Sequence, residues 1–374
     1  MTDEGLLPEG FRDCLPNDAQ LQMSLRLLLM QCIADRGYEI IDPPLVEFAD
    51  KMDHGFLFMD PQSSYALRLR SDITPQIGRI ATHRLGQWAR PLRLAYAGQV
   101  LRTRGTVLDA RRQFTQLGAE LIGNSSAPAV LELITLATDC LKSIAAESIC
   151  LNLLSPNLLT QLGRRLKIDD QRLLRLQDLF DTRDEGLLSR LGLPEMDLWR
   201  TLFAANGSLE HASKLLEPFC QDFPELKKIL DLGQMVQQAQ PKLSISMSLG
   251  ESHGFAFQTW VGFSLFAGTP SQEIIKGGTY YVGEKQNNES EEAVGFSLYL
   301  DRLLQTRLDI QRQNRCLIAA QTDEQAAKAL RNQGYATVRS LDPAETVDAT
   351  KARTLRCSHY LNQNGKACPV EGKS

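Results

Sequence analysis

The first clear pattern along the chain is a helical one. Residues 16–18, Pro-Asn-Asp, offer a helix start, and Gly37 offers an end. A short strand, residues 38–41, follows and stops at Pro43-Pro44, since proline lacks the amide proton of a strand ladder. The spacing predicts a buried amphipathic helix. Six apolar residues recur on one of its faces: Leu21, Leu25, Leu28, Leu29, Cys32 and Ile33.

Between residues 65 and 123 the apolar positions mostly alternate, as they do in strands. Leu92, Leu94 and Tyr96 show this period most clearly. We therefore expect a sheet here, with helices packed on it. The predicted elements are strands around 67–69 and 92–96, a helix over 73–85, strands at 100–102 and 114–122 joined by a long loop, and a helix from Pro128.

Residues 157–240 have a different pattern of apolar and charged positions. Apolar stripes with helical spacing alternate there with charged residues. The stripe Leu173, Leu176, Leu179 and Phe180 is an example. We interpret this segment as a helical insertion in the main domain. Strands are predicted after it at 243–247, 255–266 and 273–275, then a close turn at Gly277-Gly278 and a strand passing into a helix over 293–304.

The last part of the chain reads as a small unit of its own. A strand at 315–320, a helix at 323–334 and a strand at 336–341 are followed by residues 355–361 and a hairpin turn at Asn364-Gly365. We predict an α+β protein with two domains, residues 1–312 and a small α/β domain of residues 313–374.

Composition limits the classes of function. With 41 basic against 45 acidic side chains the formal charge is -4, so the chain offers no polycation to neutralise nucleic-acid phosphates. Eight cysteines lie mostly inside apolar runs, which indicates a reduced, cytoplasmic protein. No segment has the pattern of a signal peptide or a membrane span. We expect neither nucleic acid nor a membrane as a partner.

A metal site is also not expected. Cys357, His359 and Cys368 are the ligand types that zinc prefers, but no fourth ligand lies near them in the sequence.

Three segments together resemble the three class II motifs of histidyl-tRNA synthetases. The first is the helix and strand of residues 21–44, which form the dimer seam in that family. The second runs from Gly98-Gln-Val-Leu-Arg102 to Glu120, and the third is Gly295-Phe-Ser-Leu-Tyr-Leu-Asp-Arg302. The resemblance covers most of residues 5–305. It implies a class II aminoacyl-tRNA synthetase-like antiparallel sheet flanked by helices.

The amino-acid end of that family's pocket is retained in the sequence. The family holds the amino group of histidine with an acid and a threonine, and Asp72 and Thr74 match them. An arginine fork suits the ligand's carboxylate. The same polar residues could instead stabilise an inherited core. The resemblance implies a regulatory histidine site made of Asp72, Thr74, Arg102, Gln116, Glu120 and Tyr280.

The nucleotide end of the pocket is altered. Arg104 replaces an acid that reads adenine, Ala110 replaces an arginine, and Tyr299 replaces a glycine that lies close to the ligand. Arg112 and Arg302 are retained as possible anion contacts. We therefore expect no catalytic residues and no cofactor.

The histidine-specific signature is altered as well. His253 stands where the family has a catalytic arginine, and Gln258 stands where it has a tyrosine that contacts the imidazole ring. A histidine can serve as an acid or base near neutral pH, but one beside aromatic residues is more often simply packed. The role of His253 and the selectivity for imidazole stay open.

A synthetase-like core with these replacements resembles the regulatory subunits of ATP phosphoribosyltransferase. Only 72 residues follow Arg302 (374 minus 302), too few for the usual anticodon-binding domain. The opening, residues 6–13, is also similar to the start of that family. The resemblance implies a non-catalytic subunit that dimerises, joins a short-form catalytic subunit in a hetero-oligomer and has histidine as a candidate effector. A divergent aminoacyl ligase and a free-standing amino-acid sensor are the alternatives.

Overall fold

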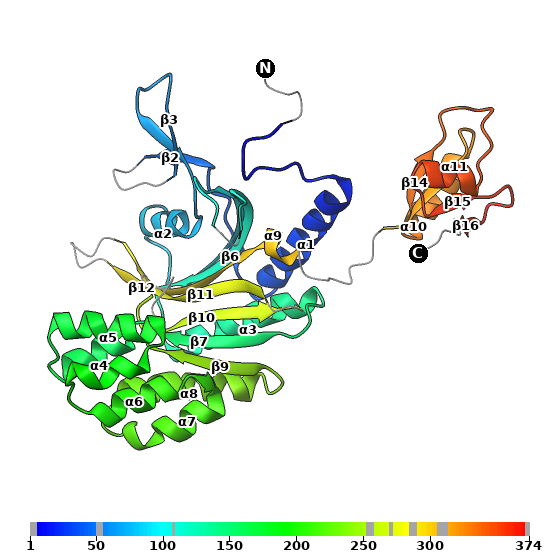
Figure 1. Ribbon diagram of the computed structural model, residues 1–374. Helices are drawn as coiled ribbons and strands as arrows, with labels where there is room; N and C mark the ends of the chain where they lie inside the picture. The colour runs from blue at the N-terminus through cyan, green and yellow to red at the C-terminus, as the bar shows by residue number, and fades with distance from the viewer. Residues whose placement is uncertain are drawn as a thin grey trace. The chain divides into compact units, whose positions relative to one another are not determined.

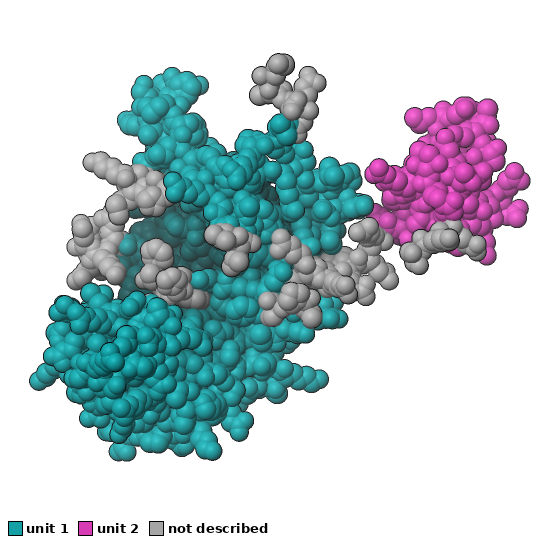
Figure 2. Space-filling model, viewed as in Figure 1, with its two compact units in different colours: residues 1–308 teal, residues 309–374 magenta. Residues whose placement is uncertain are grey.

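The computed structural model describes residues 6–49, 55–106, 109–251, 258–268, 272–283, 290–304 and 313–370. The chain divides into two compact units, residues 1–308 and 309–374, coloured separately in Figure 2. We predicted a domain boundary after residue 312, close to this division.

The larger unit is built on one long sheet, which is nine-stranded within the described residues (Figure 1). Neighbouring strands are antiparallel except for the pairs β1/β5 and β7/β9. The predicted α+β fold with a mainly antiparallel sheet is thus confirmed. In sheet order the strands are β1 (Glu39–Ile40), β5 (Leu92–Leu101), β6 (Gln113–Ile122), β12 (Glu291–Tyr299), β11 (Gln272–Val282), β10 (Gly262–Ala267), β7 (Cys150–Ser155), β9 (Ser244–Leu249) and β8 (Gly207–Ser208).

Helices pack on both faces of this sheet because its strands alternate between two apolar sets. Helix α1 (Pro16–Ala34) contacts α3 (Ala127–Ser143) and β5. Helix α2 (Thr74–His83) lies over β6 and β11 and buries Ile77 and Ala81 against Tyr96, Phe114 and Ile122. A short helix, α9 (Leu300–Leu303), follows β12 directly. The pocket described below lies on the α2 side.

The prediction for the buried face of α1 was wrong at one residue, Leu28. Leu25, Leu29 and Ile33, which are four residues apart, are buried, whereas Leu28 is 47% exposed. Leu27 on the same helix is also exposed. Because this stretch is apolar on several sides, spacing alone could not separate the buried line from its neighbours.

The predicted turn at Gly277-Gly278 was also wrong. Both residues lie inside β11 and pair with strands on both sides. A Cβ on Gly277 would lie 2.4 Å from the Phe263 ring and 2.5 Å from the backbone oxygen of Gly295. The glycine therefore serves a close approach between neighbours and not a reversal of the chain. The strand predicted from residue 255 begins at Gly262, and residues 255–257 lie outside the described residues.

The segment from 157 to 240 is helical, as predicted. Its stripe of Leu173, Leu176, Leu179 and Phe180 is buried, and Phe180 also packs edge-on against Phe203. The elements are α4 (Leu158–Arg165), α5 (Asp170–Thr182), the 3-10 turn η1 (Glu185–Leu191), α6 (Met196–Ala204), α7 (Leu209–Leu216), η2 (Glu217–Phe219) and α8 (Pro224–Ala239), with β8 between α6 and α7.

A second, three-stranded sheet in the larger unit has an apolar face. Its order is β2 (Val46–Phe48), β4 (Ala66–Leu69), β3 (Phe56–Met59). The register places Phe48 and Phe58 opposite Leu67 on one face. Phe48 is 70% exposed.

The smaller unit is a four-stranded sheet in the order β14-β13-β15-β16, with two helices in its described part. The predicted strand-helix-strand and hairpin are present. Within residues 355–361, Leu355 directly follows α11 and the strand β15 covers the last three residues. The elements are β13 (Arg315–Ile318), α10 (Glu324–Asn332), β14 (Ala336–Arg339), α11 (Ala349–Thr354), β15 (His359–Leu361) and β16 (Ala367–Pro369).

The described residues contain neither a membrane-spanning helix nor a cluster of metal ligands. None of the helices there combines the length and apolar character that crossing a bilayer requires. The described His, Cys, Asp and Glu residues form no group of three or more that could hold a metal ion.

The close packing at Gly277 gives a first prediction. We expect Gly277→Ala to lower the free energy of unfolding by about 1–3 kcal/mol, because the methyl group overpacks the Phe263 ring and a backbone oxygen. Urea unfolding measures the change. Gly186→Ala is the control, since its Cβ would lie an ordinary 3.4 Å from Asp184. Equal effects of the two substitutions would contradict the packing argument.

Candidate functional site

A large cavity of about 1420 Å³ lies over β6, β12 and β11 in the larger unit. Helix α2 forms one side, through Thr74 and Arg79, and the helical segment forms another, through Gln161 and Lys228. Figure 2 shows the surface hollowed between these parts. The cavity brings together Asp72, Thr74, Glu120 and Tyr280, four of the six residues predicted for the histidine site.

Gln116, a fifth predicted residue, is fully buried beneath the cavity and positions Asp72. Its amide nitrogen donates to Asp72 Oδ1 at 2.7 Å and to Ser297 Oγ at 2.9 Å, and its oxygen accepts from the Ile73 N–H at 3.0 Å. The Thr74 N–H also donates to Asp72 Oδ1, at 3.0 Å. The carboxylate of Asp72 is therefore held at the start of α2, facing the cavity.

Glu120 is a buried carboxylate surrounded by hydroxyl groups. Tyr280 donates to it at 2.7 Å, Thr74 at 3.1 Å and Tyr96 at 3.2 Å. Among the described residues, no lysine, arginine or histidine forms an ion pair with it. Burial, and to a smaller degree the charge of Asp72, raises the pKa of Glu120 to about 8, although the hydroxyl groups lower it. A bound cation would reverse this shift.

Arg102, the sixth predicted residue, does not line the cavity. Its guanidinium lies over the ring of Phe114, 4.8 Å from the centroid, and over that of Tyr299 at 5.1 Å. Tyr299 does line the cavity. The ring of Tyr299 thus connects Arg102 to the site.

The two predicted anion contacts are engaged with the chain itself. Arg302 donates to the backbone oxygen of Glu273 at 2.9 Å and to its carboxylate at 3.3 Å. Arg112 donates to the backbone oxygens of Arg102 and Glu9, and its guanidinium lies 4.8 Å from the centre of the Phe56 ring.

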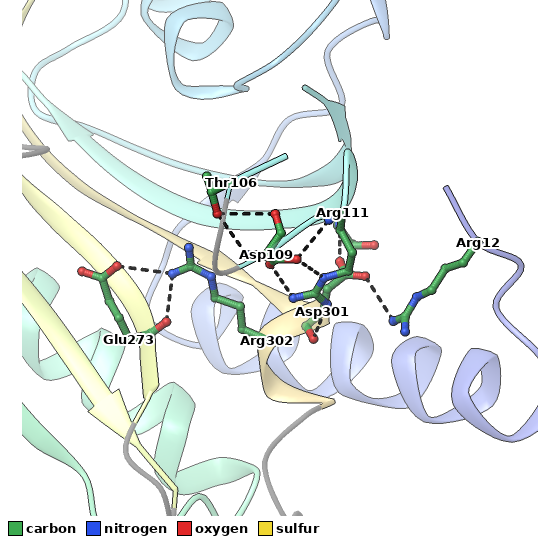
Figure 3. A network of polar contacts seen from close by, with 8 residues as sticks. Arg12, Thr106, Asp109, Arg111, Glu273, Asp301 and Arg302 are labelled. Atoms are coloured by element: carbon green, nitrogen blue, oxygen red, sulfur yellow. Dashed lines mark hydrogen bonds and ion pairs between the residues drawn. The ribbon is translucent and has the colours of Figure 1, made fainter. Parts of the chain in front are cut away.

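A polar network ties the loop between β5 and β6 to α9 (Figure 3). Arg111 donates two hydrogen bonds of 2.7 Å to the carboxylate of Asp109 and one of 2.8 Å to the backbone oxygen of Asp301. The side chain of Asp301 accepts from the Thr115 N–H at 2.8 Å. Arg111 thus has carboxylate and carbonyl partners within the chain.

Several residues of the site were not predicted. Gln258 and Lys276 line the cavity from the sheet side, and Lys228 lines it from α8, with its ammonium 3.9 Å from the Trp260 ring centre. Burial lowers the pKa of Lys276. Of these three residues, only Gln258 could have been found from the sequence, because it replaces a tyrosine that contacts the imidazole ring in the synthetase family. His253 lies outside the described residues.

Comparison with known proteins agrees with the sheet and the motifs. The model of the family described as histidyl-tRNA synthetase matches residues 10–303. Two curated relatives named ATP phosphoribosyltransferase regulatory subunit are 34% identical to the chain over 378 residues. The protein of Paramagnetospirillum magneticum aligns over 97% of both chains, and that of Rhodospirillum centenum over 96% of both.

Solved structures share the fold. An ATP phosphoribosyltransferase regulatory subunit/histidyl-tRNA synthetase from Bacillus halodurans C has a TM-score of 0.77 at 22% identity, covering 95% of this chain and 97% of that one. Histidyl-tRNA synthetase from Nostoc sp. PCC 7120 has a TM-score of 0.75 at 16% identity, covering 98% and 96%. A chain of the ATP phosphoribosyl transferase (HisG:HisZ) complex from Thermotoga maritima has a TM-score of 0.60 at 18% identity. The match covers 75% of this chain and 97% of that one.

The sheet, its class II motifs and the family match define a histidyl-tRNA synthetase-like protein of the class II fold. Within that class, the chain belongs to the family of ATP phosphoribosyltransferase regulatory subunits. The resemblance drawn from its motifs is confirmed at this level.

The buried carboxylate gives a second prediction. Because the pKa of Glu120 in the folded protein, about 8, exceeds its ordinary value of 4.5, the folded state holds a proton that the unfolded chain releases between these values. The stability this proton contributes is complete below pH 4.5 and is lost as the pH rises toward 8. Glu120→Gln cannot titrate. We expect urea unfolding to show wild type losing stability relative to this variant between pH 5 and pH 8.

Glu132→Gln is the control for this experiment. Arg93 holds the pKa of Glu132 below its usual range, so Glu132 stays ionised at both pH values and its removal should change stability equally at each. A pH-independent difference between wild type and Glu120→Gln would contradict the raised pKa.

Proposed function

We propose that this chain performs no chemistry itself and assembles with a short-form catalytic subunit of ATP phosphoribosyltransferase, whose activity it enables. Membership of the regulatory-subunit family supports this, and the Thermotoga maritima structure of similar fold is described as a HisG:HisZ complex. The assembly would carry out the first step of histidine biosynthesis, in the cytoplasm. All eight cysteines are free thiols, which suits a reducing compartment.

We further propose that the cavity is a regulatory site for histidine. The single observation that carries this is Glu120, a buried carboxylate with hydroxyl neighbours and no cationic partner among the described residues. The α-ammonium of an amino acid would supply the missing charge, beside Asp72 and Thr74. A buried carboxylate kept only for packing would be more stable as an apolar residue.

Histidine would act on the partner through linkage. If the amino acid binds one arrangement of the complex more tightly than another, it shifts their populations by the ratio of the two affinities. No covalent step on this chain is required. The partners found for Arg302 and Arg111 support a non-catalytic role, since these cations are matched by Glu273 and Asp109 and not left for a triphosphate.

Self-association as a dimer is a further part of the proposal. The exposed apolar residues Met23, Leu27 and Leu28 on α1 and Ile40 on β1 belong to the segment that forms the dimer seam in the synthetase family. Burying them against a second copy would remove apolar area from water. The charge balance still argues against nucleic acid as a partner.

Reconstitution tests the assembly. We expect the chain to co-elute with a short-form catalytic subunit and to raise its rate of joining ATP to phosphoribosyl pyrophosphate. On the same column the chain alone should run at twice its 41.8 kDa mass. No co-elution and no activation would sink the proposal, and histidine-dependent pyrophosphate exchange by the chain alone would favour a ligase.

A proton-linkage experiment tests the histidine site. Since Glu120 is mostly protonated near pH 7, pairing with an ammonium group should release about one proton per histidine bound. Calorimetry in two buffers of different ionisation enthalpy counts these protons. Glu120→Gln should abolish the release and the inhibition of the complex by histidine. Histidine inhibition that persists unchanged in this variant would place the effector elsewhere.

A further inference from the structure

Two cysteines from different helices meet in the larger unit. Cys32 lies in the last turn of α1 and Cys140 in the last turn of α3, and these two helices contact each other (Figure 1). The thiol of Cys140 donates a hydrogen bond to the sulfur of Cys32. The two residues are 108 positions apart in the sequence (140 minus 32), so the fold alone brings them together. Both are free thiols in the structure.

An ion pair holds the two helices together beside these thiols. Arg36 follows Cys32 by four residues, and Asp139 directly precedes Cys140. The guanidinium of Arg36 donates to the carboxylate of Asp139. Because the ion pair ties together the neighbouring backbone of both elements, it keeps the two sulfur atoms opposite each other.

The two thiols differ in their access to solvent. Cys140 is 1% exposed, whereas Cys32 is half-buried. A small reagent in solution can therefore reach Cys32 first, while the second thiol is protected behind it. A reachable thiol with a second thiol in contact is the arrangement in which a first oxidation product is converted into a disulfide.

The surroundings of Cys32 also favour its reactive form. The hydrogen bond from Cys140 lowers the pKa of the Cys32 thiol and the charge of Arg36 lowers it too, against the opposing effects of burial and of two aspartates, Asp139 and Asp35. The same hydrogen bond and burial raise the pKa of Cys140. Since the thiolate is the nucleophile, Cys32 is the thiol that attacks and Cys140 the one that follows.

We propose that Cys32 and Cys140 form a reversible redox pair, a modification site at which hydrogen peroxide converts two thiols into a disulfide that joins α1 to α3. The Cys32 thiolate attacks one oxygen of the peroxide, the O–O bond breaks, and a sulfenic acid and a hydroxide ion form. The Cys140 thiol then attacks the Cys32 sulfur, the S–O bond breaks, and water leaves. In total the thiols lose two electrons and two protons, and one peroxide is reduced to two molecules of water.

Thiol counting on the full chain tests the pair. After treatment of the folded chain with hydrogen peroxide, we expect the denatured chain to show six free thiols (eight minus two), and dithiothreitol should restore all eight. Mass spectrometry of a digest should identify the peptides of Cys32 and Cys140 joined to each other. Before oxidation, iodoacetamide at neutral pH should alkylate Cys32 at least about tenfold faster than Cys220, because burial raises the pKa of the Cys220 thiol.

Three variants assign the roles. Cys32→Ser should keep all of its seven thiols (eight minus one) under peroxide. Cys140→Ala should lose only one thiol, since Cys32 then stops at the sulfenic acid, which dimedone labels. Cys220→Ser is the matched control: Cys220 is also half-buried, but its thiol donates to the backbone oxygen of Leu216, and this variant should still lose two thiols. If Cys140→Ala does not fold, the count for Cys32→Ser and the identified cross-link decide.

Thermal unfolding of the oxidised chain tests whether the disulfide fits the native packing. A bond that closes a loop of this length restricts the unfolded chain, so we expect the midpoint to rise by about 5 °C or more and to return on reduction. A midpoint that is unchanged or lowered by the disulfide would show that the bond distorts the contact between α1 and α3. The claim that the fold places the two thiols for this bond would then be wrong.

Other outcomes would overturn the inference directly. Wild type that retains all eight thiols under peroxide would refute the pair. A cross-link that omits either residue, or a loss of two thiols that persists in Cys32→Ser, would assign the oxidation to other cysteines. None of these measurements involves histidine or the catalytic subunit, so the inference stands or fails separately from the proposed function.

Discussion

The structure depends on a carboxylate buried where its charge is unfavourable. Glu120 lies on β6, the third strand of the long sheet, under α2, with three hydroxyl groups and no described cation paired with it. Around it, Gln116 fixes Asp72, and Gly295 leaves room for the Glu120 side chain. The sheet register thus keeps a carboxyl group where burial favours its protonated form, and the proposed cationic ligand would favour the ionised form instead.

Three arginines next to the site are engaged by the chain itself. Arg111 and Arg302 pair with Asp109 and Glu273, while Arg102 lies on aromatic rings. In a synthetase-like pocket such cations would face phosphate groups. Here they join the β5–β6 loop to α9 and so contribute to the fold itself. These contacts agree with the proposed non-catalytic role of the chain.

Much of this could be predicted from the sequence, for physical reasons. Periodicity located most helices and strands, and the motif residues Asp72, Thr74 and Glu120 do meet at one cavity. Other features depend on partners remote in the chain: Arg111 and Asp301 are 190 residues apart, and no local pattern announces their contact. Gly277-Gly278 misled us because glycine marks both turns and close approaches. Leu28 did so because a helix with apolar residues on several sides does not reveal which side is buried.

The most direct test follows the carboxyl carbon of Glu120 by nuclear magnetic resonance while the pH is varied, with and without histidine. The account predicts a midpoint near pH 8 in the free chain and a fall of that midpoint well below neutrality when histidine is bound. A midpoint at the ordinary value of 4.5 that histidine leaves unchanged would contradict it.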